Sequence, residues 1–239
     1  MSNGGGAVGH LDIGGVFAKT TEIYKRTFVR VWVVALILMV PAGIIQALLG
    51  DDGAGQWIGQ LVNLIASAWL IGSLVKVVED VEVDGRIDRS VGDVLGSVLP
   101  RLLGLIVLQI IVAIIVGVGL LLLIIPGIIL YLVLVAAVPA FVVEERGVFD
   151  SMSRSAELTK GNRMRILGVG LVVLAIWIAV GVIAALLIAL SPIIGVLALI
   201  VASVALYPYV SIITAVLYFR LRELKGGATS GPLGEPAAA

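Results

Sequence analysis

Long apolar runs alternate along the chain with short polar segments, and this pattern predicts membrane-spanning helices. A bilayer core about 30 Å thick is crossed by a helix of about 20 apolar residues. Six stretches reach or approach that length, and we expect transmembrane helices over residues 31–49, 57–78, 102–125, 127–143, 166–190 and 193–219. The fourth is the shortest, because about 17 residues at about 1.5 Å each span only about 25 Å.

Amphipathic stretches precede the first, third and fifth of these spans. Apolar residues recur at helical spacing over residues 13–28 and 91–102, and more weakly over 148–156. Ser90 and Asp93 have the spacing of a capping box. An apolar stripe with a cationic polar face is typical of a helix that lies at the membrane surface or packs against the ends of spans, and both alternatives stay open.

These elements predict an all-α fold, a polytopic helical membrane bundle of six transmembrane helices plus about three amphipathic cytoplasmic-surface helices. The chain then reads as three units of surface helix and transmembrane hairpin. We expect one membrane domain over residues 11–225, a disordered leader over 1–10 and a disordered tail over 226–239. The composition agrees, because only 13% of the 239 residues are charged, whereas a soluble domain has about a quarter.

The positions of Lys and Arg predict the orientation of the spans, because cytoplasmic loops retain these residues. With the N-terminus inside, all 16 basic residues fall in the inner segments 1–30, 76–101, 144–165 and 220–239. We therefore expect six crossings with both termini cytoplasmic in the bacterial plasma (inner) membrane. The cations nearest the span ends are candidates for contact with anionic lipid headgroups: Lys25, Arg26, Arg30, Arg101, Arg163 and Arg165.

Polar residues are rare within the predicted spans, and the only charged one is Lys76, one turn from the end of the second span. Gln60, Asn63 and Ser67 share one helix face, which would line a polar pathway or, more commonly, form interhelical hydrogen bonds. Gln109 is a further candidate for such a pathway. The lack of a buried Asp, Glu, His or Arg lowers the expectation of an ion-coupled transporter.

The charged segments outside the spans show no pattern typical of a metal-binding or catalytic site. The acidic run "EDVEVDGRID" lacks the ordered oxygen spacing of a calcium loop, so we interpret it as a solvated connector. Glu144 and Glu145 form a carboxylate pair, but Arg146 follows at once and no nucleophile or second motif lies near them. The sequence contains no cysteine, no phosphate-binding loop and a single histidine, His10, so we predict no cofactor, no metal and no catalytic residue. The net charge of zero offers no attraction for nucleic acid.

A series of motifs in residues 92–165 resembles a known family. The motifs read "LPRLLG", "LLLIIPGIIL", "VPAFVVEERG" and "SMSRSAELTKGNRMRILG". They resemble the membrane domain attached to some bacterial glycerophosphoryl diester phosphodiesterases, which also occurs in stand-alone multi-pass proteins. The resemblance implies a shared fold and a membrane location. We expect no hydrolase activity, because that chemistry resides in a separate barrel domain, for which the sequence leaves no room.

The residues that carry this resemblance are structural in character: Pro126, Gly127, Pro139, Glu144, Ser155, Lys160, Gly161 and Asn162. The run "LTKGNR" is expected to join a surface helix to the fifth span. Lys160 would lie in the last turn of the surface helix, Gly161 would adopt a left-handed conformation after it, and Asn162 would cap the next helix. Arg163 and Arg165 would reach lipid phosphates.

The sequence thus favours a non-enzymatic, structural or accessory membrane protein. The bilayer and anionic headgroups are the expected partners, with a protein partner or a second copy as further options. The alternative is a permease-like transporter of a small solute, which would show a polar cavity near Asn63 or Gln109. A third, less favoured class is an intramembrane lipid-modifying enzyme, in which Glu144 or Glu145 would converge with another reactive group.

Overall fold

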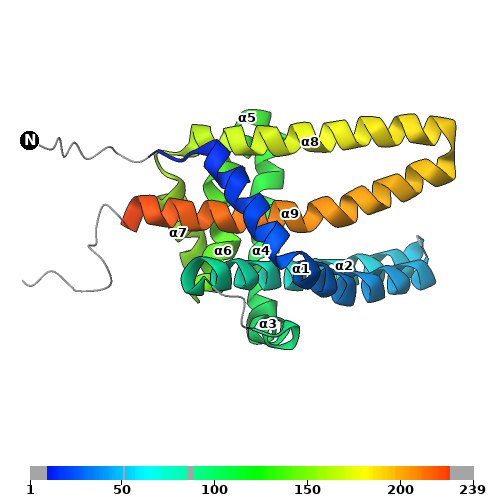
Figure 1. Ribbon diagram of the computed structural model, residues 1–239, viewed down its shortest axis with the longest axis horizontal. Helices are drawn as coiled ribbons and strands as arrows, with labels where there is room; N and C mark the ends of the chain where they lie inside the picture. Colours follow the sequence, from blue (N-terminus) through cyan, green and yellow to red (C-terminus); the bar gives the residue numbers. More distant parts are fainter. Residues whose placement is uncertain (1–9, 51, 86–88, 227–239) are drawn as a thin grey trace, which may run out of the picture.

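The computed structural model describes residues 10–50, 52–85 and 89–226, and this described part consists of helices and short connections without a strand (Figure 1). Six of its helical segments are long and apolar enough to cross a membrane. The expected all-α architecture with six candidate spans is therefore confirmed for the described residues. The predicted disorder of the two ends falls outside them, apart from His10 and Gly226.

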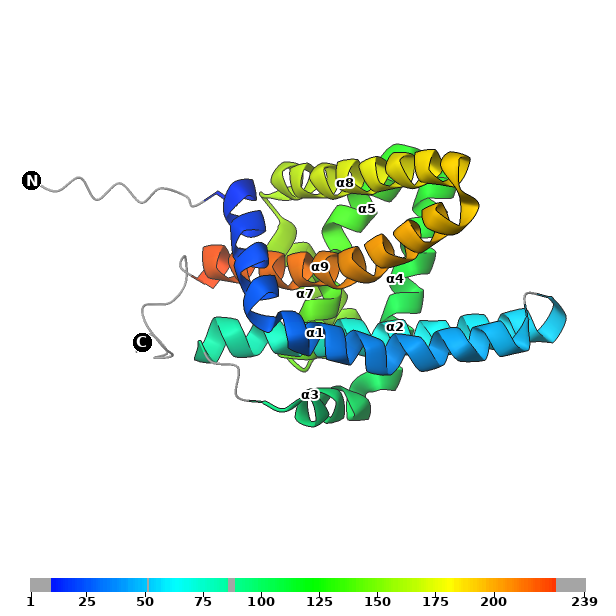
Figure 2. The same cartoon turned by 45° about the vertical axis from the view of Figure 1, so that its right-hand side comes forward.

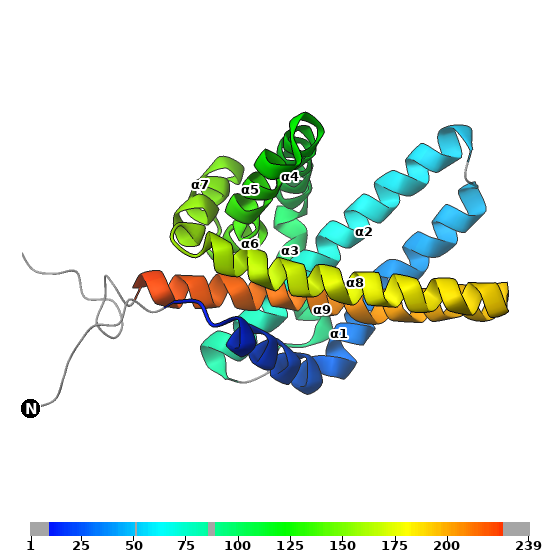
Figure 3. The same cartoon turned by 90° about the horizontal axis from the view of Figure 1, so that it is seen from above.

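The helices follow one another in three hairpins within the described residues. Their bounds are α1 (Ile13–Leu49), α2 (Gly53–Glu79), α3 (Val91–Val98), α4 (Leu102–Leu122), α5 (Ile124–Leu134), α6 (Ala137–Val143), α7 (Val148–Thr159), α8 (Arg163–Leu190) and α9 (Pro192–Gly226). Helix α1 pairs with α2, α4 with α5, and α8 with α9. Figure 3 shows that the hairpins spread away from one another instead of lying parallel.

The first helix differs from the prediction of a separate surface helix and span. The stretch 13–28 and the span 31–49 form one continuous helix, which changes direction part-way along its length (Figure 2). The hydroxyls of Thr21 and Thr27 each donate to a carbonyl four residues earlier, at 2.8 and 2.7 Å. Such back-bonding competes with the helical hydrogen bonds and bends helices.

The fourth span begins earlier than predicted and is interrupted. Leu123 alone separates α4 from α5, so Pro126 lies in the first turn of α5 and not between the two helices. The span breaks at Val135 before α6 begins. Pro139 accounts for the break, because it has no N–H to donate to the Val135 carbonyl four residues earlier.

One local prediction is confirmed at the start of the second hairpin, and the turn of the same hairpin is closely packed. Ser90 and Asp93 form the capping box of α3, with the Asp93 amide donating to Ser90 Oγ at 3.2 Å. Gly127 lies where α4 and α5 approach closely, since a Cβ on Gly119 would come within 3.0 Å of its Cα. Glycine is required here for packing, because a side chain would force the two helices apart.

Buried side chains gather at one end of the molecule. We call this end the base, formed by the described residues of 11–30, 70–108, 132–170 and 208–226. The turns of the hairpins, at residues 44–58, 118–128 and 186–197, are called the tips. The largest fully buried side chains of the described chain all belong to the base: Leu11, Ile23, Leu70, Leu74, Leu105, Leu108, Leu158, Ile166, Ile212, Leu217, Tyr218 and Leu221.

Candidate functional site

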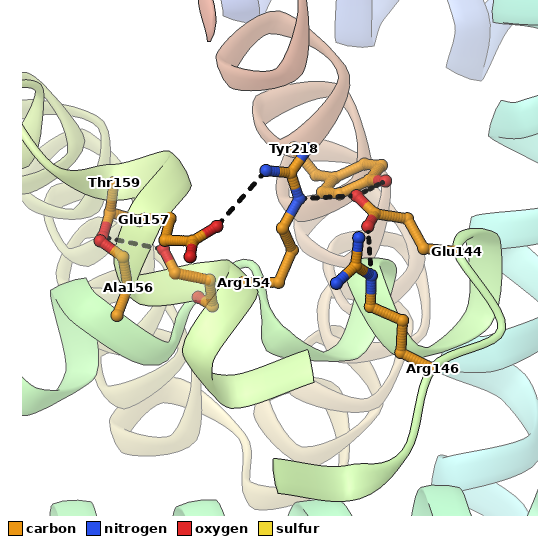
Figure 4. Close-up of polar contacts among 8 residues, drawn as sticks. Glu144, Arg146, Arg154, Ala156, Glu157, Thr159 and Tyr218 are labelled. Atoms are coloured by element: carbon orange, nitrogen blue, oxygen red, sulfur yellow. Dashed lines mark hydrogen bonds and ion pairs between the residues drawn. The ribbon is translucent and has the colours of Figure 1, made fainter. Parts of the chain in front are cut away.

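A cluster of charged and polar side chains joins α6, α7 and α9 in the base (Figure 4). The Glu144 carboxylate follows α6, and its Oε1 accepts hydrogen bonds from Arg154 Nε at 3.0 Å and from the Tyr218 hydroxyl at 2.8 Å. Its Oε2 lies 2.6 Å from Arg146 Nε. Arg154 also reaches Glu157, at 3.4 Å. Both oxygens of Glu144 are therefore engaged, and four charges balance within one cluster.

The surroundings of Glu144 keep its carboxylate ionised. Burial alone would raise the pKa of Glu144, but hydrogen bonds from Arg154 and Tyr218, together with the charges of Arg154 and Arg146, outweigh burial and hold it below its ordinary value. A general base works best when its pKa lies near the working pH. This carboxylate is thus suited to tying three helices together and poorly suited to taking up a proton at neutral pH.

The predicted carboxylate pair separates in the structure. Glu145 has a left-handed backbone, with φ of 52°, and its side chain is 62% exposed. It pairs with Arg101 at 3.0 Å, on a different part of the surface from the Glu144 cluster. Glu144 and Glu145 therefore make separate contacts, and the reactive groups that converge on Glu144 are Tyr218 and Arg154.

The "LTKGNR" run forms the expected helix end and turn, but with a different role for its polar residues. Helix α7 ends at Thr159, so Lys160 follows the helix by one residue, and Gly161 has the positive φ of 90° that the turn requires. Asn162 precedes α8 but makes no side-chain cap. Its Oδ1 accepts instead from the Leu11 amide, at 3.2 Å.

Arg165 completes a clamp on the N-terminal segment. Its Nη1 donates to the Leu11 carbonyl at 2.7 Å, so Asn162 and Arg165 hold both backbone groups of one residue. The Leu11 side chain is 1% exposed and belongs to the core. We expected Asn162 to cap a helix and Arg165 to reach lipid, whereas both side chains secure the segment that leads into α1.

Ser155 repairs the interruption of the fourth span. Its hydroxyl donates to the Val133 carbonyl at 2.6 Å and accepts from the Ala136 amide at 3.1 Å. These backbone groups lie at the break, where the regular helical pattern is lost, and a buried backbone group without a partner is costly. Ser155 in α7 therefore offsets the cost of the unpaired backbone groups at the break and links α7 to the fourth span.

The described part of the acidic run after the second span, residues 79–85, is not a solvated connector, and residues 86–88 of the run lie outside the described residues. Residues Asp80–Asp84 form a π-helical turn that continues α2, and Asp80 is 3% exposed. Asp80 pairs with Arg89 at 3.2 Å, and Glu82 lies 3.8 Å from Lys19. The prediction failed because it did not anticipate these partners, Lys19 in α1 and Arg89 in the connection before α3. In the described chain, no group of His, Asp and Glu residues is arranged to hold a metal ion.

The candidate lipid-contact cations fall into two sets. Lys25 and Arg163 are exposed, and no ion pair joins either to another described residue. Arg26, also exposed, pairs with Glu22 at 2.8 Å. The remaining three are engaged or shielded to different extents: Arg101 with Glu145, Arg165 with Leu11, and the half-buried Arg30.

The residues of the predicted polar pathway do not come together in one place in the structure. Gln60, Asn63 and Ser67 line one cavity of about 600 Å³ between the α1–α2 and α8–α9 hairpins. Most other lining side chains are apolar, so this is no polar channel. Gln109 lines none of the cavities found in the described chain, and its amide nitrogen is buried without a hydrogen-bond partner there.

Sequence reasoning missed Tyr218, Arg154 and Leu11. Tyr218 lies inside a span, and its contact with Glu144 joins residues 74 positions apart. One signal was available for Arg154. It comes after Glu144 in the sequence and lies on α7, a helix whose apolar stripe must face the base. Leu11 offered no signal, because it acts through its own backbone amide and carbonyl. The side chains that bind these groups are remote in the sequence.

The comparisons with known proteins identify a family and assign no activity. No curated protein and no solved structure matches the chain. The model of one family, described as an uncharacterised protein family (UPF0259), matches residues 56–224. This match lends no support to a relationship with the phosphodiesterase membrane domain, which stays a resemblance of motifs. Because the match covers well over half of the sequence, the chain belongs to the UPF0259 family.

Proposed function

We propose that the protein is a non-enzymatic, multi-pass accessory protein of the bacterial plasma membrane, whose base binds anionic lipid headgroups at the cytoplasmic face. The observation that carries this proposal is the pairing of exposed cations with exposed apolar side chains on the base. Lys25 and Arg26 are followed by Phe28 and Val29, which are 46% and 73% exposed. Such neighbours suit a membrane interface, where apolar groups enter the acyl region and cations meet phosphates.

A second group with the same character lies between α7 and α8. Arg163 is exposed beside Met164, whose side chain is 77% exposed. In water an exposed methionine of this kind gains nothing, whereas at a lipid surface it buries apolar area while the neighbouring guanidinium binds a phosphate. Two remote segments of the base thus present the same combination of groups.

An aromatic cluster marks the level of the interface on α1. Tyr24 packs edge-on against Phe28 and Tyr209, with ring centroids 5.7 and 5.5 Å apart. Trp32 donates its indole N–H to the Tyr24 hydroxyl at 3.1 Å. Tyr and Trp gather at membrane interfaces because their rings are apolar at one end and polar at the other. The cluster therefore supports an interface just beyond Lys25 and Arg26.

The base is proposed to be cytoplasmic, with both termini on that side. The tips contain no Lys or Arg, whereas all 16 basic residues of the sequence lie toward the opposite ends of the spans. Because the sequence has no cysteine, Asp52→Cys and Ser191→Cys each introduce a unique label. An impermeant maleimide added to intact cells should modify both. Labelling only after the membrane is permeabilised would contradict this orientation.

Lipid binding is tested with two variants of equal charge change. Lys25→Gln/Arg163→Gln removes two exposed cations, and Arg101→Gln/Arg220→Gln removes two that pair with Glu145 and Glu223. Each variant is purified from vesicles of phosphatidylglycerol and phosphatidylcholine, and the co-purified lipids are quantified. Since each such contact contributes about 1 kcal/mol, the loss of two should reduce the preference of the first variant for phosphatidylglycerol about 30-fold.

The second variant is the control, because its cations already have carboxylate partners. It should keep most of the preference for phosphatidylglycerol. Equal retention of phosphatidylglycerol by the two variants, or a preference unchanged from the native chain in both, would overturn the proposed headgroup site.

A second candidate function is that of a permease for a small solute. The observation that favours it is the cavity beside Asn63, which four helices line at the middle of their spans. It ranks second because the lining is mainly apolar, with few polar groups to replace the water around a hydrophilic solute.

A further inference from the structure

A large cavity of the described chain lies between two hairpins, within helices that are long and apolar enough to cross a membrane. It measures about 600 Å³, within the range of about 300–1,000 Å³ that is typical of small-molecule sites. Helices α1, α2, α8 and α9 contribute to its walls through residues such as Leu36, Gln60, Trp177 and Tyr207. The cavity lies between the base, to which its lining residues Leu70 and Pro208 belong, and the tips, which end close to Gln60.

A second cavity adjoins the first at two aromatic residues. It measures about 380 Å³, lies between the α4–α5 hairpin and α9, and shares Trp177 and Tyr207 with the larger cavity. The two rings therefore form a wall that the two cavities share.

The lining offers hydrogen bonds but no charge. The residues that line the two cavities in the described chain include no Asp, Glu, Lys, Arg or His. The Gln60 side chain is exposed in the larger cavity, and no hydrogen bond joins its amide to another described residue. The Asn63 amide nitrogen donates to Gln46 Oε1 and to the Gly59 carbonyl, at 3.2 and 3.1 Å.

The backbone of α9 adds an acceptor to the same wall. Pro208 lies inside the helix and has no N–H to donate to the Val204 carbonyl four residues earlier. Both residues line the larger cavity. An unpaired amide, and a carbonyl that has lost its regular helical donor, are expensive among lipid chains, because lipid chains form no hydrogen bonds. A bound molecule with its own donor and acceptor would relieve this cost.

From these groups we propose that the cavity binds a neutral lipid, whose polar group is a hydroxyl or ester and not a phosphate. The apolar walls receive the chain of the lipid, Trp177 and Tyr207 contact it along its length, and Gln60 with the Val204 carbonyl binds its oxygen group. A phosphate at this depth would meet no cation, and an unpaired charge in an apolar environment costs far more than a hydroxyl. The inference does not depend on the proposed headgroup site at the base.

The test compares two photoreactive lipids that carry the same diazirine-labelled acyl chain. One is a diacylglycerol and the other a phosphatidylglycerol, each incorporated with the full-length protein into nanodiscs. After irradiation, labelled peptides are identified by mass spectrometry. The diacylglycerol should label the peptides that contain Asn63 and Tyr207 several-fold more strongly than the phosphatidylglycerol does. Equal labelling by the two lipids would show ordinary surrounding lipid and overturn the proposal.

Two variants connect the labelling to the cavity. Gln60→Leu keeps the size of the side chain and removes the amide, so labelling by diacylglycerol should fall about fivefold, the effect of one hydrogen bond. Folding should not suffer, because the change removes an unpaired polar group from a lipid-accessible helix. Leu36→Trp adds bulk to the wall and should reduce labelling by both lipids at these peptides.

The matched control for added bulk is Leu121→Trp, at a tip leucine that is 86% exposed. It should leave labelling unchanged, because Leu121 lines none of the cavities. Labelling that is unaffected by Gln60→Leu and by Leu36→Trp would place the lipid elsewhere and overturn the site.

Discussion

The base and the tips of the molecule are stabilised by different surroundings. In the base, Leu105, Leu158 and Tyr218 are completely buried by other side chains of the protein. At the tips, Leu48 and Leu190 are 82% and 84% exposed. In water such exposure would oppose folding, but lipid chains are as apolar as leucine, so the tips gain nothing by packing together. The hairpins can therefore spread, whereas the base must be closely packed.

The two regions also treat polar groups differently. In the base, Glu144 has a partner for each oxygen, and Ser155 satisfies the backbone groups of a broken helix. Between the hairpins, the Gln60 amide has no hydrogen-bond partner among the described residues. The charged cluster and the broken helix of the base are thus paired within the protein, although the buried hydroxyls of Thr20 and Ser73, also in the base, have no hydrogen-bond partner among the described residues.

The sharpest test of this comparison is the deletion of one leucine side chain in each region. Leu105→Ala in the base should lower the free energy of unfolding by about 3 kcal/mol, because it leaves a cavity among packed side chains. Leu121→Ala at a tip should change it by less than about 0.5 kcal/mol, since lipid fills the space. Thermal unfolding in lipid nanodiscs measures both. Similar losses would show that the tips are packed in the membrane.

The next largest effect is expected from the charged cluster. Glu144→Ala should destabilise the protein by about 3 kcal/mol, because it leaves Arg154 and the buried Tyr218 hydroxyl without their partner. Glu145→Ala is the control, since it breaks only an exposed pair with Arg101 and should cost less than about 1 kcal/mol. Both are measured by chemical denaturation in detergent. A cost for Glu145→Ala as large as that for Glu144→Ala would refute the structural role of the cluster.

A smaller loss should follow from the removal of one hydroxyl in the base. Ser155→Ala leaves the Ala136 amide and the Val133 carbonyl unpaired, and should cost about 2 kcal/mol. Ser97→Ala removes a hydroxyl that bonds only to the Val94 carbonyl of its own helix, at 2.8 Å, and should be nearly neutral. The melting temperatures of the two variants are measured under one condition. A lower value for Ser155→Ala than for Ser97→Ala would support the role of Ser155 at the break, and equal values would contradict it.

The smallest expected effect is a dependence of stability on acid. Because the pKa of Glu144 in the folded protein lies below its ordinary value of 4.5, the unfolded chain takes up a proton first as the pH falls. The stabilisation is therefore complete above pH 4.5 and decreases as the pH falls through the folded pKa. Melting temperatures measured downward from pH 6 should fall less steeply in Glu144→Gln than in the native chain. Identical slopes would mean that Glu144 does not contribute.

Features that depend on local sequence could be predicted. The six spans follow from apolar length, the capping box of α3 from the spacing of Ser90 and Asp93, and the left-handed Gly161 from the end of one helix and the start of the next. Each of these is determined by residues within a few positions. Their outcome does not depend on which other helices pack nearby.

Features that depend on tertiary contacts could not be predicted. Asn162 is a common helix cap, yet its side chain binds the amide of a residue 151 positions away. Asp80 looked solvated until the position of Arg89 was known. Glu144 looked like half of a carboxylate pair, whereas its partners come from α7 and α9. In each case the residue type indicated a capacity for hydrogen bonding, and the fold selected the partner.

The clamp on Leu11 has a consequence for the order of biosynthesis. The ribosome makes Leu11 and α1 first, but Asn162 and Arg165 emerge only after four spans have been produced. During translation the backbone of Leu11 must therefore wait for its partners, and the N-terminal segment cannot settle into the base before the start of α8 has left the ribosome. Closure of the base is thus a late event of membrane insertion, and a chain truncated before Asn162 would retain an unsecured N-terminus.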